Sequence, residues 1–416
     1  MRSQINNMKR IYPLYAFLFT IILLVACRKD NAVKPGRALT LSAAELQQAS
    51  ADNTFSFDLF RSVAANSGNG NLFISPLSVS MALGMTTNGA NGATLDSMRK
   101  VLHMNGFSQD QVNTYYSDLL TQLPELDPNT TLKIANSVWY RNTYSVLPQF
   151  LQTESKSFQA KVEGLDFSSP SSVNTINNWV SQQTNGKIPK IVSQINGNDI
   201  MFLINAVYFK SIWANKFDPS NTKAQAFTRA DNSQVQTPFM RGKMSCNVYL
   251  GSDATLLELP YSGNKYSMVI IMPPTGKSVN DMMSNLDSAK WQKWTGQLSS
   301  AKYDLEIPKF QFSYGTELKS PLTAMGMGIA FSDAADFSKI NSSGGLQITS
   351  VQHKAYVNVD ETGTTAAAAT SVVIGVSAVL NQTITVDHPF IFMIREMKSG
   401  LVLFTGIVND PTQNGQ

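Results

Sequence analysis

Apolar residues recur at helical spacing early in the chain and in strand-like runs later. Helical spacing is clear in residues 53–66, NTFSFDLFRSVAAN, and in residues 76–90, PLSVSMALGMTTNGA. Ser75 and Pro76 predict the start of the second helix, because serine caps a helix and proline fixes its first φ angle.

Runs rich in β-branched and aromatic residues predict the strands. They are residues 131–140, 200–213, 266–273, 303–312, 354–360, 390–396 and 400–409. Helices that gather before a series of strands favour a mixed α+β domain. We find no internal repeat and no long linker that would divide it.

The N-terminus has the pattern of a bacterial export signal. Arg2, Lys9 and Arg10 precede an apolar run, residues 11–26, and Cys27 follows it. Leu24-Val25-Ala26-Cys27 resembles a lipobox, in which the cysteine thiol takes a lipid before cleavage. An uncleaved anchor and an ordinary secretory signal are the alternatives.

This pattern predicts the domain organisation and the location of the protein. We expect a lipoprotein signal peptide at 1–26, lipidated Cys27 with a flexible tether to residue 50, one domain over 51–412, and a tail at 413–416. The lipid would hold the protein on a bacterial outer membrane, at its periplasmic or its cell-surface face.

Charge and cysteine content exclude several classes of function. The chain has 33 Lys and Arg against 29 Asp and Glu, and three of the basic residues lie in the leader. The mature chain is therefore almost neutral, which gives no reason to expect nucleic-acid binding. Cys246 is the only cysteine besides Cys27, so no intramolecular disulfide is expected, and we expect a monomer.

No pattern of catalytic or metal-binding residues is present. The three histidines, His103, His353 and His388, are not at metal-ligand spacing, and no G-x-S-x-G motif occurs. The TGKS at 275–278 is not a phosphate-binding loop, because Ile271 stands where the first glycine is required. We therefore expect neither an enzyme nor a cofactor.

The most unusual segment is residues 362–386, which carry no charge. Its apolar centre, 366–380, is too short to span a membrane, which takes roughly 20 residues. Its Thr, Ser and Gly residues also argue against a transmembrane helix.

Five segments in a fixed order resemble the serpin family, a match that extends over about residues 51–412. They are residues 71–102, 205–219, 307–328, 351–370 and 387–411. The resemblance implies an α+β fold of three β-sheets with about nine helices. It also implies an exposed reactive centre loop near the C-terminus, at about 361–385, which includes the uncharged segment.

The resemblance also assigns residues to the parts of a conformational switch. The hinge of the loop would be formed by Glu361, Gly363, Thr364, Ala366, Ala367, Ala368 and Ala369. A polar cluster beneath the main sheet, called the shutter, would contain Ser75, Ser78, Asn205 and His353. Trp213 would lie at the top of that sheet, in the region called the breach.

The loop has the composition that insertion into a sheet requires. With Thr364 as the first inward side chain, the inward row is Thr364, Ala366, Ala368, Thr370, Val372 and Ile374. Neither this row nor the alternate one contains a charge, whose burial would cost several kcal/mol. Proline, which would remove a ladder hydrogen bond, is absent from 361–388.

The family mechanism implied is suicide inhibition of a serine or cysteine endopeptidase. The reactive bond is predicted at Ser377–Ala378, or at Ala378–Val379 if the loop is counted from its C-terminal side, and Val376 is a third site. These small residues favour elastase-like or subtilisin-like proteases. The partner would be the protease, covalently bound. No helical stretch clusters Lys and Arg for activation by a polyanion. The alternative is a non-inhibitory binding, storage or chaperone protein of the same fold.

Overall fold

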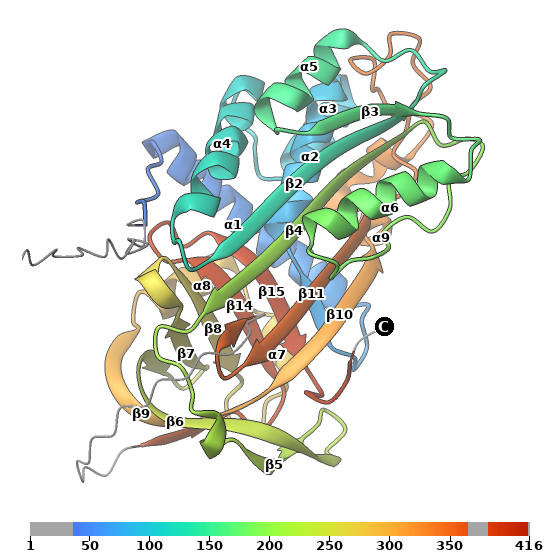
Figure 1. Cartoon of the computed structure of the whole chain (residues 1–416). Coiled ribbons are helices and arrows are strands. Elements are labelled where there is room, and N and C mark those ends of the chain that lie inside the picture. Colours follow the sequence, from blue (N-terminus) through green and yellow to red (C-terminus); the bar gives the residue numbers. More distant parts are fainter. Residues whose placement is uncertain (1–35, 365–381, 415–416) are drawn as a thin grey trace, which may run out of the picture. The chain divides into compact units, whose positions relative to one another are not determined.

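Helices and strands are interleaved in the computed structural model, which describes residues 36–364 and 382–414 (Figure 1). The helices in these ranges are α1 Ala43–Ala64, α2 Pro76–Gly89, α3 Gly92–Val101, α4 Gln109–Gln122, α5 Pro148–Ser157, α6 Ser171–Gln183, α7 Val279–Met283, α8 Ser288–Thr295 and α9 Lys319–Leu322. The strands are β1 Leu72–Ile74, β2 Thr131–Arg141, β3 Lys161–Leu165, β4 Met201–Ile212, β5 Lys223–Thr228, β6 Gln234–Leu250, β7 Thr255–Pro260, β8 Tyr266–Met272, β9 Ser299–Pro308, β10 Phe310–Glu317, β11 Gln352–Asp360, β12 Gly363–Thr364, β13 Thr383–Thr385, β14 Phe390–Glu396 and β15 Val402–Val408. The α+β class predicted from the sequence is confirmed.

The first helix begins before Ala51, inside the segment expected to be a tether. Ser42 caps α1 by accepting the Glu45 N–H at its hydroxyl, and the Glu45 carboxylate accepts the Ser42 N–H, which completes a capping box. Gln48 and Ala49 are buried. The folded part of the chain therefore includes residues 43–50, because the capping box starts the helix ten residues before the clear apolar spacing at residue 53.

Two hydrogen-bonded sheets connect the described strands. One has the order β10-β11-β12-β4-β2-β3, and the other has the order β1-β15-β14-β8-β7-β6-β9-β13, with β5 added to β6. Strand β6 is long enough to pair with β5 near its start, with β7 near its end and with β9 in between. The resemblance implies three β-sheets, whereas the described strands form two, because β6 joins β5, β7 and β9 in one sheet.

The apolar run at 303–312 forms two strands and not one. Pro308 ends β9, and β10 begins at Phe310. Proline has no N–H for the ladder, so the chain can leave one sheet here and enter the other. The same break places Lys309 between the two sheets.

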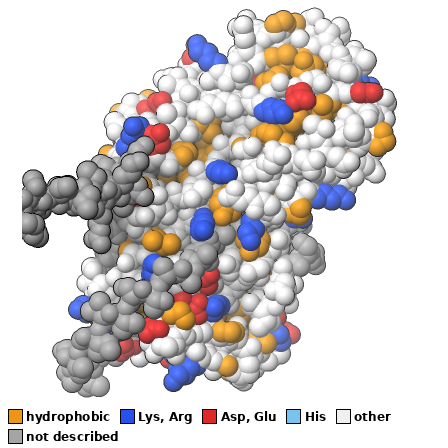
Figure 2. All heavy atoms as spheres, viewed as in Figure 1, with side chains coloured by type: hydrophobic (Ala, Val, Ile, Leu, Met, Phe, Trp, Pro, Cys, Tyr) orange, Lys and Arg blue, Asp and Glu red, His pale blue; other side chains and the backbone are white. Residues whose placement is uncertain are grey.

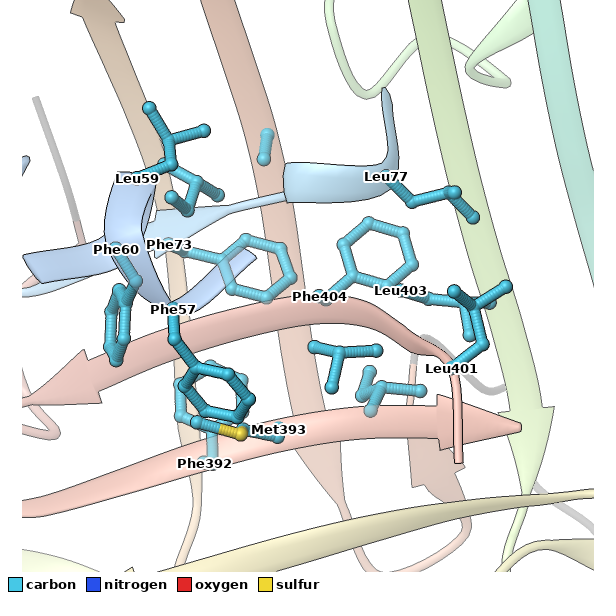
Figure 3. Close-up of a cluster of buried hydrophobic side chains, with 14 of the residues drawn as sticks. Phe57, Leu59, Phe60, Phe73, Leu77, Phe392, Met393, Leu401, Leu403 and Phe404 are labelled. Atoms are coloured by element: carbon cyan, nitrogen blue, oxygen red, sulfur yellow. The ribbon is translucent and has the colours of Figure 1, made fainter. Parts of the chain in front are cut away.

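The main core lies between the first helices and strands β1, β14 and β15 (Figure 3). Phe73 of β1 stacks on Phe392 and on Phe404, with ring centres 5.4 Å apart in both pairs. Phe57 and Phe60 of α1 add to the cluster from the helical side. These contacts join residues more than 300 positions apart in the sequence.

A second, smaller core lies on the other face of the six-stranded sheet, beneath α6 (Figure 1). Ile176 and Val180 of α6 pack there against Trp139, Ile204 and Ala206 of the sheet. The sheet thus has an inner face toward the main core and an outer face toward α6. Figure 2 views the molecule from this outer side.

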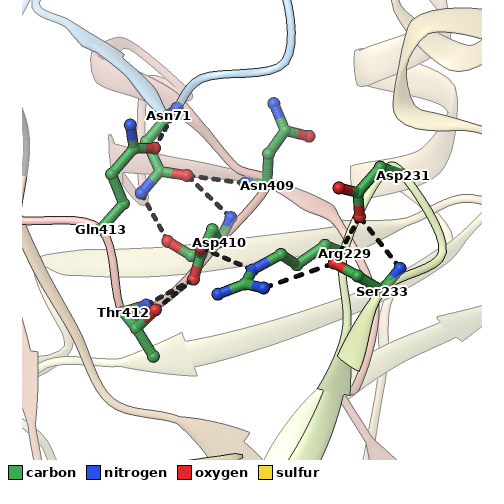
Figure 4. A network of polar contacts seen from close by, with 8 residues as sticks. All are labelled: Asn71, Arg229, Asp231, Ser233, Asn409, Asp410, Thr412 and Gln413. Carbon is green, nitrogen blue, oxygen red and sulfur yellow. Dashed lines mark hydrogen bonds and ion pairs between the residues drawn. The ribbon is translucent and has the colours of Figure 1, made fainter. Parts of the chain in front are cut away.

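The end of the chain is fixed by a polar network (Figure 4). Asn71 accepts hydrogen bonds from the backbone N–H groups of Asn409 and Asp410, at 2.8 and 3.0 Å. The Asp410 carboxylate pairs with Arg229, which lies in the turn between β5 and β6. The network links the residues after β15 to the segment before β1 and to the turn between β5 and β6.

Candidate functional site

A strand position in the middle of the six-stranded sheet is filled by described residues only at one end. Strand β12 is antiparallel to both β4 and β11 and lies between them, with Thr364 opposite Ser211 and Val359. Beyond these two residues, no described strand separates β4 from β11, and no backbone ladder joins them directly. We call this position the open slot.

The two residues of β12 fit closely between the end of β4 and the end of β11, where they begin the open slot. Thr364 is 2% exposed, and its hydroxyl lies 2.6 Å from the Tyr261 hydroxyl. A Cβ atom on Gly363 would lie 2.1 Å from the carbonyl oxygen of Ser211, so that only glycine fits there. The inward direction predicted for Thr364 agrees with this burial.

Trp213 holds the chain around β12, at the top of the sheet. Its backbone N–H donates to the Thr362 carbonyl, and its indole N–H donates to the Asp360 carbonyl, both at 2.9 Å. The Trp213 ring stacks on Tyr261 with ring centres 4.7 Å apart. Trp213 therefore contacts the turn between β11 and β12, in the region where the sequence placed it.

Glu361 anchors the same turn through its side chain. Its carboxylate accepts hydrogen bonds from Lys309 Nζ at 2.8 Å and from the Thr222 hydroxyl at 2.7 Å. Burial acts to raise the pKa of Glu361, but these two hydrogen bonds outweigh it and hold the pKa below its usual value. Glu361 is thus charged and paired at the entrance to the open slot.

The four predicted shutter residues do come together beneath the sheet. Ser75 donates its hydroxyl to the Leu403 carbonyl at 2.8 Å, and its N–H donates to His353 Nε2 at 3.1 Å. The Ser78 hydroxyl donates to the side-chain carbonyl of Asn205. Because Ser75 and Ser78 lie at the start of α2, this helix connects β4, β11 and β15.

Asn136 of β2 belongs to the same cluster, and the sequence analysis missed it. It accepts a hydrogen bond from the Asn205 amide at 2.5 Å and donates to the Phe158 carbonyl at 2.7 Å. Asparagine is unusual in a buried strand. That anomaly in the run 131–140 was the only available signal.

His353 is neutral in this cluster. Burial lowers the pKa of its imidazole to about 4, and Nε2 must be unprotonated to accept the Ser75 N–H. His353 therefore acts as a fixed acceptor and not as a general base.

A cavity of about 550 Å³ lies at the end of the open slot that is farther from β12. The part of the cavity nearest to β12 is lined by Ser78, Asn205 and His353. Its apolar walls come from α2 and from the segment before β11, and include Val79, Leu83, Phe337 and Ile340. The site thus combines an unpaired strand position with space for inward side chains.

Several predicted site residues lie outside the described residues. They are Ala366, Ala367, Ala368, Ala369, Ser377, Ala378, Val379 and the lipidation candidate Cys27. Within residues 36–364 and 382–414, no cluster of His, Cys, Asp or Glu is arranged to hold a metal ion. No helix in those ranges is long and apolar enough to cross a membrane.

The comparisons with known proteins agree with this fold. The family model described as "Serpin (serine protease inhibitor)" matches residues 50–411. A leukocyte elastase inhibitor of Xenopus laevis is 33% identical over 377 residues, which cover 87% of this chain and 99% of that protein. The native state of the thermophilic serpin tengpin superposes with a TM-score of 0.82 at 32% identity, over 90% of this chain and 96% of tengpin.

Human thyroxine-binding globulin in complex with thyroxine is also similar. Its TM-score is 0.82 at 29% identity, over 89% of this chain and all of the globulin chain. A family match over most of the chain defines its class, which is that of the serine protease inhibitors called serpins. The chain belongs to the serpin family.

Proposed function

We propose that the protein inhibits a serine or cysteine protease as a suicide substrate. The protease would attack the reactive loop and form an acyl-enzyme. The cleaved loop would then enter the open slot and carry the protease with it before the ester hydrolyses. The open slot between β4 and β11, already started by β12, is the observation that carries this proposal.

The register of β12 specifies where the rest of the loop would pair. Continued from Thr364, Ala366 would lie opposite Phe209 and Val357, and Thr370 would lie opposite Asn205 and His353. Further along, Val372 would lie opposite Leu203, and Ile374 opposite Met201, and both of these β4 residues line the cavity. The loop would thus place a hydroxyl at the polar cluster and two apolar side chains in the cavity.

We propose an elastase-like or subtilisin-like target. The reactive bond would be Ser377–Ala378 or Ala378–Val379, and a small residue suits a shallow specificity pocket. The name of the Xenopus laevis relative, an elastase inhibitor, supports the same class.

We further propose that the inhibitor is displayed from a bacterial outer membrane by a lipid on Cys27. The support is the sequence pattern Leu24-Val25-Ala26-Cys27 behind a basic and apolar leader. The protein would then protect the cell surface or the periplasm from proteases of a host, of a competitor or of the cell itself.

A serpin that binds a ligand without inhibiting a protease is the alternative. Thyroxine-binding globulin, in complex with thyroxine, shows that the fold can hold a small molecule. Such a protein would not need a charge-free inward row, whereas residues 362–386 carry no charge. That composition favours the inhibitor.

The test is to mix the purified protein with an elastase and to separate the products on a denaturing gel. We expect a stable covalent complex and a released peptide whose mass places the cut after Ser377 or Ala378. Thr364→Arg should be cleaved without forming the complex, because arginine cannot replace a buried threonine in β12. Thr364→Val is the matched control and should still inhibit. Cleavage of the wild type without any complex would favour the ligand-binding alternative.

A further inference from the structure

A second cavity, of about 720 Å³, lies between α1, the end of α3 and the residues after α9. Asp58, Arg61, Lys100 and His103 supply its charged and titratable side chains, and we call it the α1–α3 pocket. Its volume lies in the range of sites that hold small organic ligands, roughly 300 to 1,000 Å³. It shares no lining residue with the cavity of the open slot, so it is a separate site.

The one acidic side chain among the described residues of the α1–α3 pocket is already paired. Arg61 donates from Nη2 to Oδ1 of Asp58, and His103 Nε2 donates to Oδ2 at 2.8 Å, since an ionised carboxylate only accepts. Both oxygens of Asp58 thus have a partner within the protein. Among these described residues, no free carboxylate is left for a cationic ligand.

The positive side chains of the pocket keep hydrogen-bond donors free. Arg61 is held in place by a second hydrogen bond, from Nη1 to the Leu286 carbonyl at 2.9 Å. A guanidinium has five N–H groups, so three remain after its bonds to Asp58 and Leu286. Lys100 is exposed and forms no ion pair with any described residue, unlike the lysines that do. An anion would therefore meet two cationic side chains, one of them fixed before it binds.

His103 stands at a backbone position that favours glycine. The His103 N–H donates to the Lys100 carbonyl and the Met104 N–H donates to the Arg99 carbonyl, which is the pattern of a Schellman cap. His103 has a φ of 55°, in the left-handed region, where a side chain costs conformational energy. A residue kept at such a position is a candidate for a role of its side chain. Here the imidazole occupies one oxygen of Asp58, which makes the pocket more favourable for an anion.

We propose that the α1–α3 pocket binds a small organic anion, a phosphate monoester or a carboxylate that carries a short apolar group. The anionic head would receive charge-assisted hydrogen bonds from Arg61 and Lys100. The apolar group would lie on Val101, Ala324 and Met325, which line the same pocket. The site goes beyond protease inhibition and does not depend on it, because it lies apart from the open slot.

Isothermal titration calorimetry of the purified protein with phenyl phosphate tests the proposal. Inorganic phosphate presents the head group alone, and benzylamine presents a similar ring with a positive charge. We expect phenyl phosphate to bind with a dissociation constant below about 1 mM, and at least about tenfold more tightly than either comparison compound. No saturable binding of phenyl phosphate up to about 10 mM, or tighter binding of benzylamine, would overturn the proposal. So would equal affinity for inorganic phosphate, because the apolar wall would then contribute nothing.

Two variants separate binding from folding. Lys100→Gln should weaken phenyl phosphate binding at least about fivefold, whereas Lys277→Gln, at an exposed lysine between β8 and α7, should bind as wild type does. His103→Gly should keep the stability of the fold, because glycine suits a φ of 55°. It should nevertheless bind more weakly, because one oxygen of Asp58 is then free to repel the anion. Wild-type affinity in Lys100→Gln, or an equal loss in Lys100→Gln and Lys277→Gln, would show that the pocket is not the binding site.

Discussion

Two fully buried side chains, His353 and Asp52, respond to acid in opposite directions. The pKa of His353 falls to about 4 in the folded protein, below the usual histidine value, so the unfolded chain binds a proton more readily. Stability from this group is present at neutral pH and is lost as the pH falls from about 6.5 to 4. The loss amounts to about 3 kcal/mol.

Asp52 has the reverse effect. Burial raises its pKa to about 6, although hydroxyl groups of Ser80, Tyr115 and Tyr116 donate to it and offset part of the shift. The folded state therefore binds a proton more readily than the unfolded chain. Acidification from about pH 6 to 4 adds about 3 kcal/mol of stability through this group.

We therefore predict that replacing either group exposes the effect of the other on the pH dependence of the unfolding free energy. Relative to wild type, Asp52→Asn should lose about 3 kcal/mol of unfolding free energy between pH 6.5 and 4, and His353→Gln should gain a similar amount. Denaturant unfolding at a series of pH values measures both, and the difference from wild type removes the contribution of exposed carboxylates. Parallel profiles for Asp52→Asn and wild type would contradict the assignment.

At the scale of elements, the alternation of the loop gives a direct test of its register. In the proposed inserted state Ala366 points inward, opposite Phe209 and Val357, whereas Ala367 points outward between Tyr208 and Tyr356. Lys210 and Lys354 also point outward, each two residues from the level of Ala367. Neighbouring residues should therefore differ sharply in their tolerance of a negative charge.

We predict that Ala366→Glu abolishes inhibition and that Ala367→Glu preserves it. The inward carboxylate would be buried without a partner, at a cost of several kcal/mol, and the outward one would lie near lysines. The fraction of protein that forms the covalent complex with an elastase, against the fraction simply cleaved, measures the difference. If both variants become substrates to the same extent, the register continued from β12 is wrong.

The sequence predicted the types of α1, α2 and eight of the strands, but not the other elements or the points at which elements start or change sheet. The runs 200–213 and 354–360 became β4 and β11, since their apolar pattern leaves no alternative to a buried strand. The start of α1 depended on the Ser42–Glu45 capping box, and the division of 303–312 depended on Pro308. Such local signals outweigh the apolar pattern at element boundaries.

The candidate site could be predicted only where the family order of motifs supplied it. Ser75 and His353 are 278 residues apart, and nothing in their separate sequences indicates that they bond. Asn136 was missed for the same reason, because its neighbours come from distant segments.

At the scale of the whole molecule, the open slot predicts a large gain in stability after cleavage. Insertion would give β4 and β11 new ladder partners and would fill the cavity of about 550 Å³. Each ladder hydrogen bond contributes about 1 kcal/mol to the free energy of unfolding. Each kcal/mol raises the midpoint of thermal unfolding of a large domain by about 2 °C.

We expect the cleaved protein to unfold roughly 20 °C or more above the intact protein. Calorimetry before and after cleavage by a protease that is then inactivated measures this shift. Cleaved Thr364→Arg should not show it, because its loop cannot enter the slot. An unchanged midpoint for the cleaved wild type would contradict insertion.

Strand β12 also affects how quickly the cleaved loop could insert into the sheet. A free strand that enters a sheet must find one alignment among several, and a slip of one residue would exchange its two faces. Gly363 and Thr364 are already paired on both sides, so the alignment is chosen while the loop is intact. In the proposed mechanism, the register of the inserting strand is therefore fixed before a protease binds. Only strand pairing then remains to be completed during the short lifetime of the acyl-enzyme.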